Sequence, residues 1–170
     1  GATHIVLTEQ MREDFERQWP SMQTLILNNA GLVVAPSVSA PRTLHDIVTI
    51  GHLSNISISK GIGRVVDCAI ESKRRGRKLR LVVAGPVTDA AAYKEIERAG
   101  RELGASFDYR GAVSGESKEK FYSDIDFFLF PSAYRNEAAP LVLIESLARG
   151  IPCVTSTSGA MKSEKIYNDI

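Results

Sequence analysis

Short apolar stretches alternate with longer amphipathic stretches from residue 47 onward, and this alternation constrains the fold more than any other feature of the sequence. Within 62–74, for example, Ile62, Val65 and Ala69 recur with the period of a helix. Strands that alternate with helices through short loops require a parallel sheet covered on both faces. We therefore predict an α/β fold with a Rossmann-like parallel sheet, in which ligands bind beyond the carboxyl ends of the strands. The predicted strands are 47–51, 79–84, 107–110, 126–130 and 151–155, and the predicted helices are 62–74, 89–103, 116–123 and 140–149.

The first 46 residues have a less regular pattern. Residues 4–8 and 25–27 are predicted as short strands, and between them Thr8 is placed to cap a helix that runs to Trp19. A stretch rich in Ser and Pro follows over 36–41 and favours a linker. We divide the chain into a β–α unit at 1–31, a linker at 32–46 and an α/β domain at 47–170.

The 170 residues are enough for one full domain, and their charges nearly cancel. The chain has 21 Lys and Arg residues against 20 Asp and Glu residues, so we expect no general attraction to nucleic acid or to an anionic membrane. No apolar run approaches the roughly 20 residues of a membrane span, and no secretory signal is visible. One basic cluster is predicted at a helix end, where it complements the helix dipole, and a lipid or nucleic-acid patch is the alternative. The cluster consists of Lys73, Arg74, Arg75, Arg77, Lys78 and Arg80.

Cys68 and Cys153 each lie in an apolar run, which predicts two buried free thiols rather than a disulfide. No Cys or His pair has the spacing of metal ligands, and we see no Asp-x-Asp metal site, so we predict no metal site. We also predict no cofactor. Free thiols are typical of a reducing compartment, which favours a cytoplasmic protein.

The strongest local signal for chemistry follows the strand predicted at 126–130. Pro140 suits the first turn of a helix, because its missing N–H would have no partner there. The free N–H groups of residues 141–143 would then form a site for a diphosphate. Glu137 lies just before this helix, and Glu145 lies one turn inside it, where a carboxylate can accept two hydrogen bonds from a vicinal diol such as that of ribose. The alternative is an ordinary helix whose acidic residues complement its dipole, and these residues alone favour neither reading.

A weaker signal is the pair Gly51 and His52 followed by Lys60 and Gly61. A glycine at the end of the first strand would let the backbone approach a ligand, and a lysine at the next helix start can neutralise phosphate. A solvated lysine on the helix is the commoner case. The sequence has no Walker phosphate loop and no Gly-x-Gly-x-x-Gly after a strand, so NAD binding has little support.

The stretch 47–160 resembles the C-terminal domain of group 1 (family 4) glycosyltransferases of the GT-B fold. Four pieces follow the order of that family, and the last contains paired glutamates with seven residues between them. Each piece is modest, but the ordered set is specific. The pieces are Gly51-His52-Leu53 with Lys60-Gly61, then Leu81 to Pro86, then Tyr109 to Val113, and then Phe130-Pro131-Ser132 with residues 137–154.

This resemblance implies a role for each matching position. Glu145 would hold the ribose hydroxyls, Glu137 would hold hydroxyls of the transferred sugar, and Lys60 would bind the diphosphate. Residues 1–31 resemble the last β–α unit of the partner domain and the segment that crosses into this one. The remaining donor-binding positions are Gly51, His52, Ala139, Leu141 and Val142 around the diphosphate, and Gly111 and Val113 beside the base.

Two positions depart from the family pattern. His52 stands where the family usually has Arg, and the spacing to Lys60 is longer than usual. Histidine is a weaker and pH-dependent partner for phosphate, so donor binding is expected to differ. The loop after Glu137 reads Ala138-Ala139-Pro140 where the family usually has Gly-Phe-Gly, and this change would alter which donor sugar fits.

The resemblance implies a glycosyltransferase of the hexosyltransferase type that transfers sugar with retention from a UDP or GDP sugar. Lys60, Glu137 and His52 are the residues predicted to take part in catalysis. The acceptor, a sugar or a glycolipid, would dock on a missing N-terminal domain, so we expect this fragment to be inactive by itself and the domain 47–170 to be truncated at its C-terminus. The parent enzyme would serve polysaccharide biosynthesis, and the sequence leaves open whether that enzyme makes peripheral contact with a membrane. Two other functions stay open: a non-catalytic nucleotide-sugar-binding module, and a sugar epimerase or phosphorylase of the same fold.

Overall fold

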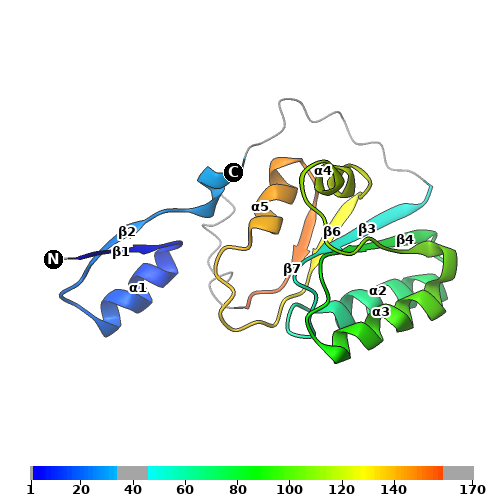
Figure 1. Cartoon of the computed structure of the whole chain (residues 1–170), viewed down its shortest axis with the longest axis horizontal. Helices are drawn as coiled ribbons and strands as arrows, with labels where there is room; N and C mark the ends of the chain where they lie inside the picture. The colour runs from blue at the N-terminus through cyan, green and yellow to red at the C-terminus, as the bar shows by residue number, and fades with distance from the viewer. Residues whose placement is uncertain (1, 34–45, 159–170) are drawn as a thin grey trace.

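The computed structural model describes residues 2–33 and 46–158, and within these ranges it contains two parallel sheets. A two-stranded sheet pairs β1 with β2, and a five-stranded sheet has the order β5-β4-β3-β6-β7 (Figure 1). The N-terminal part consists of β1 (Thr3–Val6), α1 (Glu9–Gln18), β2 (Gln23–Ile26) and the 3-10 helix η1 (Asn29–Leu32). The larger part consists of β3 (Val48–Leu53), α2 (Ile62–Arg74), β4 (Leu79–Ala84), α3 (Ala90–Leu103), η2 (Gly104–Ser106), β5 (Phe107–Tyr109), α4 (Gly115–Ser123), β6 (Phe127–Phe130), α5 (Leu141–Ala148) and β7 (Cys153–Thr155).

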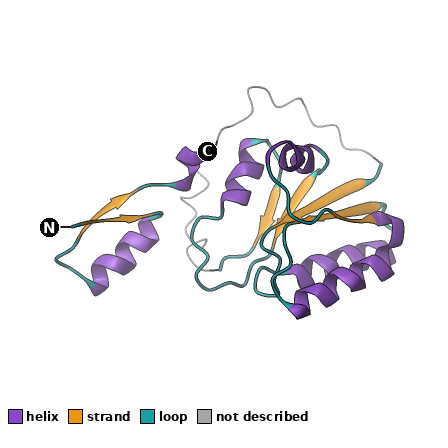
Figure 2. Cartoon of the chain, in the orientation of Figure 1, coloured by secondary structure: helices purple, strands orange, loops and turns teal. Residues whose placement is uncertain are grey.

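Helices cover both faces of the five-stranded sheet, as the alternation in the sequence predicted. Helices α2 and α3 pack on one face, and α4 and α5 pack on the other (Figure 2). Each face has its own hydrophobic core: the first core lies under α2 and α3, and the second core lies under α4 and α5. Successive residues of a strand point to opposite faces, so Leu81 and Val83 of β4 join the first core while Val82 and Ala84 join the second core. Burial on both faces explains the continuous apolar runs at 81–84 in β4 and over Phe127–Phe130 in β6.

The helix ends follow local capping chemistry. Asp89 caps α3 by accepting a hydrogen bond from the N–H of Ala92 at 2.7 Å, and Gly104 ends that helix with a positive φ of 58°. Ser114 and Ser117 form a capping box at the start of α4.

In the larger part, every predicted strand and helix is present, and its ends differ from the predicted ones by at most two residues.

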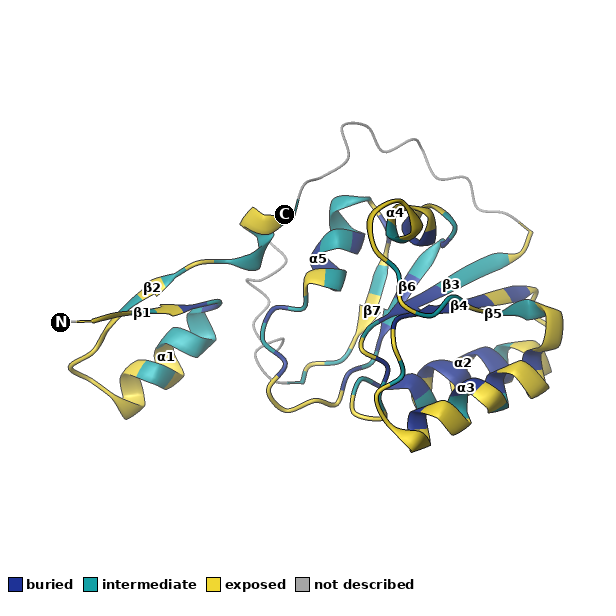
Figure 3. Cartoon of the chain, viewed as in Figure 1, coloured by how far each residue is buried: buried dark blue, intermediate teal, exposed yellow. Residues whose placement is uncertain are grey.

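The N-terminal part forms a small layer of its own. Thr8 accepts a hydrogen bond from the N–H of Met11 and caps α1, which begins at Glu9. This contact confirms the predicted cap. No residue of α1 is buried, and the two strands expose Ile5 and Leu25 (Figure 3). The Asn29 side chain donates to the carbonyl of Ala139 at 2.8 Å and ties this part to the larger one. Most of the predicted linker lies outside the described residues.

Two sequence expectations concern surface residues. The basic cluster begins at the C-terminal end of α2 as predicted, with Lys73 and Arg74 in the last turn, but its last member, Arg80, lies inside β4. Cys68 was predicted to be buried, but it is exposed, because the buried side of α2 is formed by residues at positions 65, 66, 69 and 70. Cys153 is partly buried, and burial raises the pKa of its thiol to about 12. No helix in the described ranges is long and apolar enough to cross a membrane.

Candidate functional site

Lys60 and Glu137 meet at the carboxyl edge of the larger sheet, although 77 residues separate them in the chain. Strands β3 and β6 are neighbours, so the loop after β3, which carries Lys60, lies beside the loop after β6, which carries Glu137. The Lys60 ammonium is 2.7 Å from Oε2 of Glu137. The Ser132 hydroxyl donates to the same oxygen at 2.8 Å, and Glu137 is buried. Both charged residues were predicted for this edge, whereas no role was predicted for Ser132.

Aromatic rings surround the Lys60 ammonium. Its nitrogen lies 4.8 Å from the ring centroid of Tyr134 and 5.9 Å from that of Phe130, within the range of cation–π attraction. Gly61 follows with φ of 89°, and a Cβ atom at this position would lie 2.3 Å from the carbonyl oxygen of Pro131. The glycine is therefore needed because the loop after β3 passes directly against the end of β6.

The start of α5 follows Glu137 closely in the sequence, but its geometry differs from the prediction. Pro140 is the N-cap rather than a residue of the first turn, and its carbonyl accepts a hydrogen bond from the N–H of Leu143 at 3.1 Å. The prediction that the Leu143 N–H is free is therefore wrong. The N–H groups of Leu141 and Val142 have no acceptor among the described residues, so they keep the capacity to bind an anion. The neighbouring predicted residue, Ala139, is buried.

Glu145 lies one turn further along α5 and is held by two residues of α4. Lys118 Nζ is 2.5 Å from its Oε1, and the Tyr122 hydroxyl donates to its Oε2 at 2.7 Å. Neither partner was predicted from the sequence. Their spacing of four residues places them on one side of α4, but it does not indicate that this side meets Glu145.

His52 does not have the placement expected of a phosphate partner. Its side chain is fully buried, with Nδ1 2.9 Å from the carbonyl oxygen of Leu129 and Nε2 3.0 Å from the Ser54 hydroxyl. Because a carbonyl only accepts, Nδ1 carries the proton and Nε2 accepts from Ser54. Burial lowers the pKa of His52 to about 4, against the opposing effect of the Leu129 carbonyl, so the ring is neutral at pH 7. The expected direct contact with phosphate is therefore not supported by this geometry.

Gly51 also differs from its expected role. It lies inside β3 rather than at its end, and a Cβ atom there would lie 2.5 Å from Cδ1 of Ile125 and 3.0 Å from Cζ of Phe121. The residue is needed so that α4 and the turn after it can pack on the sheet. The prediction that this glycine lets a ligand approach the backbone is therefore replaced by a packing role.

The loop after β5, which was predicted to line the base, is tied to the loop after β4. The carbonyl of Gly111 accepts a hydrogen bond from the N–H of Gly85 at 2.6 Å, and the Tyr109 hydroxyl donates to the Gly85 carbonyl at 3.0 Å. Gly111 has a positive φ of 63°, and Val113 packs against the second core. The structure thus places Gly111 and Val113 at the same edge as Lys60, on the other side of β3 from Glu137.

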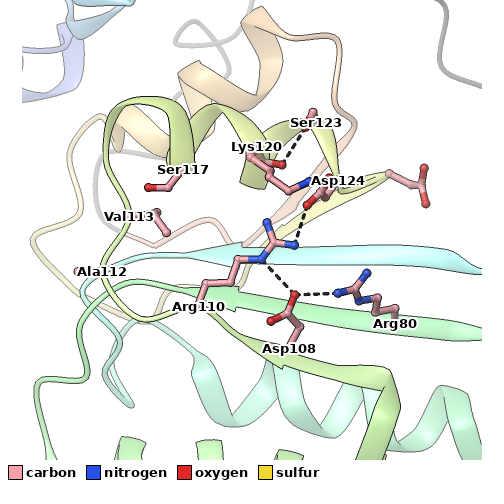
Figure 4. Close-up of a pocket in the computed structure, with 10 residues that line it drawn as sticks. Arg80, Asp108, Arg110, Ala112, Val113, Ser117, Lys120, Ser123 and Asp124 are labelled. Carbon is pink, nitrogen blue, oxygen red and sulfur yellow. Dashed lines mark hydrogen bonds and ion pairs between the residues drawn. The ribbon is translucent and has the colours of Figure 1, made fainter.

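A charged groove lies on the sheet face between β4, β5 and α4 (Figure 4). Arg110 occupies its middle and bridges Asp108 at 3.1 Å and Asp124 at 2.7 Å. The prediction overlooked one Asp-x-Asp sequence, which Asp124 and Asp126 form, and Asp126 accepts a hydrogen bond from the N–H of Thr49. No group of three or more His, Cys, Asp or Glu residues in the described part of the chain is arranged to hold a metal ion.

Comparison with known sequences identifies relatives over most of the chain. The model of the family "Glycosyl transferases group 1" matches residues 26–165. The putative glycosyltransferase EpsF of Bacillus subtilis (strain 168) is 32% identical over 113 residues, which is 66% of this chain and 28% of EpsF.

Solved structures share the fold at lower identity. TarM of S. aureus, in complex with fondaparinux, alpha-GlcNAc-glycerol and UDP, has a TM-score of 0.71 at 20% identity, over 93% of this chain and 31% of TarM. The pneumococcal O-GlcNAc transferase GtfA, in complex with UDP and GlcNAc, has a TM-score of 0.68 at 16% identity, over 94% of this chain and 31% of GtfA. WaaG, a glycosyltransferase involved in lipopolysaccharide biosynthesis, has a TM-score of 0.66 at 17% identity, over 97% of this chain and 46% of WaaG.

The chain spans less than half the length of each of these proteins. Its parallel sheet with helices on both faces is the fold of one half of a GT-B glycosyltransferase. The family match covers well over half of the chain and includes the edge that carries Lys60, Glu137 and Glu145. The chain therefore belongs to the group 1 glycosyl transferase family.

Proposed function

We propose that this chain is the donor-binding part of a glycosyltransferase. It binds a nucleoside-diphosphate sugar and supports transfer of that sugar, with retention of its anomeric configuration, to an acceptor held by another domain of the same protein. The observation that carries this proposal is the pair of Lys60 and Glu137 at the carboxyl edge of the sheet, in the loops that precede α2 and α5. Family membership supports it, and so does the presence of UDP in the TarM and GtfA structures.

Lys60 is the proposed partner of the diphosphate. A diphosphate carries more negative charge than one carboxylate, so it competes with Glu137 for the Lys60 ammonium. The N–H groups of Leu141 and Val142, together with the dipole of α5, add to the attraction. When the bond between sugar and phosphate breaks, negative charge grows on the departing diphosphate, and Lys60 stabilises that charge.

Glu137 is the proposed partner of the transferred sugar. When Lys60 turns to the diphosphate, the Ser132 hydroxyl still holds Oε2 of Glu137. The carboxylate then stays in place and keeps lone pairs for sugar hydroxyls. Glu145, one turn inside α5, is the proposed partner of the ribose hydroxyls.

The N-terminal part supports the proposal of a second domain. A two-stranded parallel sheet is too small to be stable alone, and here it exposes Ile5, Leu25 and Leu27. We infer that this part completes the sheet of an acceptor-binding domain, as the size of the relatives also favours. Retention, a hexose donor carried by UDP or GDP, and a sugar or glycolipid acceptor used in polysaccharide biosynthesis belong to the same proposal. Free thiols at Cys68 and Cys153 support a reducing compartment such as the cytoplasm.

The second candidate is a module that binds nucleotide sugar without catalysis. It is favoured by the burial of His52, which leaves Lys60 as the one charged cationic side chain among the predicted site residues. Both candidates predict nucleotide binding, and they differ in whether a complete protein with an acceptor domain transfers sugar.

The test of the shared prediction is a calorimetric binding series with UDP, GDP and ADP, their monophosphates and their glucose conjugates. We expect one nucleoside diphosphate to bind more tightly than its monophosphate. Absence of binding by every diphosphate, to a chain that circular dichroism shows to be folded, would contradict the proposal. Sugar transfer by the 170-residue chain alone would contradict the part of the proposal that places the acceptor on another domain.

A further inference from the structure

The carboxylate of Glu145 has a donor on each of its oxygens. Lys118 Nζ lies 2.5 Å from Oε1, and the Tyr122 hydroxyl lies 2.7 Å from Oε2. A carboxylate accepts about four hydrogen bonds, so these two contacts use about half of its capacity. The remainder matches the two hydroxyls of a vicinal diol.

Tyr122 is a rigid donor. Its ring is buried in the second core, where it contacts the rings of Phe121 and Phe128. The guanidinium of Arg149 lies 4.7 Å from the ring centroid and donates through Nη1 to the backbone carbonyl of Glu145, so the ring and the helix backbone are held together. Burial and the charge of Glu145 raise the pKa of Tyr122, and the hydroxyl stays protonated as a donor.

Lys118 reaches Glu145 from the same side of α4, one turn before Tyr122. Its side chain is 29% exposed, so it closes the outer side of the carboxylate while Tyr122 closes the inner side. A buried hydroxyl and a half-buried ammonium together leave the Glu145 side chain with one favourable orientation.

We propose that Lys118 and Tyr122 are positioning residues for ribose recognition: they hold the Glu145 carboxylate so that its remaining lone pairs meet the 2′- and 3′-hydroxyls of the nucleotide. This inference rests on the proposed function, in which Glu145 reads the ribose. A structural role alone, in which the contacts join α4 to α5, would affect stability but not the distinction between ribose and deoxyribose.

The test measures affinity for UDP and for 2′-deoxy-UDP by calorimetry in the full chain. A hydrogen bond to a charged group is strong, so the original protein should bind UDP about tenfold or more tightly than 2′-deoxy-UDP. We call this ratio the preference for UDP. Tyr122→Phe and Lys118→Met should each lower this preference by about threefold to tenfold, with affinity for 2′-deoxy-UDP changed less than about twofold. Lys118→Arg, which keeps a donor, should restore most of the preference.

Two controls separate the possible failures. Lys120→Met removes a lysine of α4 that pairs with Asp124 instead of Glu145, and it should leave the preference unchanged. Glu145→Gln should reduce the preference and tests the ribose assignment itself. If Glu145→Gln reduces it while Tyr122→Phe and Lys118→Met do not, the positioning role is overturned and the proposed function stands. If the original protein shows no preference, or if Glu145→Gln keeps it, the ribose assignment fails and the positioning role fails with it.

Discussion

Two ionic clusters lie on the larger sheet, and they differ in how completely their charges are matched. In the groove over β4 and β5, Arg110 bridges Asp108 and Asp124, so each charge has a permanent partner. At the carboxyl edge, Lys60 has one carboxylate partner, Glu137, and lies beside loops that follow two strands. The groove is the more obvious cavity, but its network is closed. Close to Glu137 in the chain, the N–H groups of Leu141 and Val142 have no acceptor within residues 2–33 and 46–158, and an anionic ligand needs such donors beside a cation.

The largest expected effect tests whether the edge cluster depends on a close backbone contact. Gly61→Ala should lower the free energy of unfolding by roughly 3–5 kcal/mol, because the new methyl group would meet the Pro131 carbonyl in a left-handed conformation. Gly76→Ala is the matched control, since Gly76 has φ of 72° and nothing lies within 4 Å of the added Cβ atom. It should cost about 1 kcal/mol. Chemical denaturation measures both, and equal losses would contradict the packing account.

The second expected effect concerns His52, which belongs to neither cluster. Its pKa is lowered to about 4 in the folded state, so the unfolded chain binds a proton that the folded chain does not. The stability that the neutral His52 ring allows is therefore complete above its unfolded pKa of about 6.5. As the pH falls from there toward 4, the free energy of unfolding drops by roughly 3 kcal/mol through this residue.

The measurement for His52 is an NMR titration of its ring combined with unfolding at pH 7 and pH 4.5. UDP affinity should not rise between pH 8 and pH 6 through protonation of this ring, because the ring stays neutral in that range. A His52 pKa near 6.5, with tighter UDP binding as the ring gains its proton, would return this residue to the phosphate site.

The third prediction separates the two clusters by function. Arg110→Met should lower the free energy of unfolding by about 1–2 kcal/mol, because it leaves Asp108 and Asp124 without their shared partner. UDP affinity should stay within about twofold of the original value. Chemical denaturation measures the loss of stability of this variant, and calorimetry measures its UDP affinity. A large loss of UDP affinity would mean that the groove belongs to the ligand site.

Partial burial alone would raise the pKa of Asp124, but hydrogen bonds and charges from Arg110 and Lys120 outweigh it and hold this pKa below its ordinary value. The stability that these contacts give is therefore present at neutral pH and is lost as the pH falls through the lowered pKa. The difference in stability between the original protein and Arg110→Met should accordingly shrink in strong acid.

The sequence predicted the fold well and assigned Lys60 and Glu137 to one edge of the sheet, for a physical reason. Strands buried on both faces and helices with one buried side leave clear periodic patterns, and loops after neighbouring strands must meet at one edge. Lys60 and Glu137 could therefore be assigned to the same edge, although their contact with each other was not predicted. The partners of Glu145 could not be predicted, because Lys118 and Tyr122 reach it through the packing of α4 against α5, which no local pattern records.

The errors at Gly51 and His52 have a single cause. The strand was predicted to end at Gly51, but β3 continues to Leu53. Those two extra residues move His52 from the expected ligand loop into the sheet, where its ring is enclosed, and they place Gly51 under Ile125. A shift of two residues at a strand end is small for the fold and decisive for the site.

The most direct test of the central claim compares UDP with UMP on Lys60→Met. If Lys60 binds the diphosphate, this change should weaken UDP binding by about tenfold and UMP binding by no more than about threefold. Arg64→Met is the control, because Arg64 lies four residues away and contacts the Pro131 carbonyl instead of Glu137. A selective loss for UDP in Lys60→Met, with little change in the control, is the result we predict. Equal losses for UDP and UMP, or no loss for either, would contradict the assignment of the Lys60–Glu137 edge as the diphosphate site.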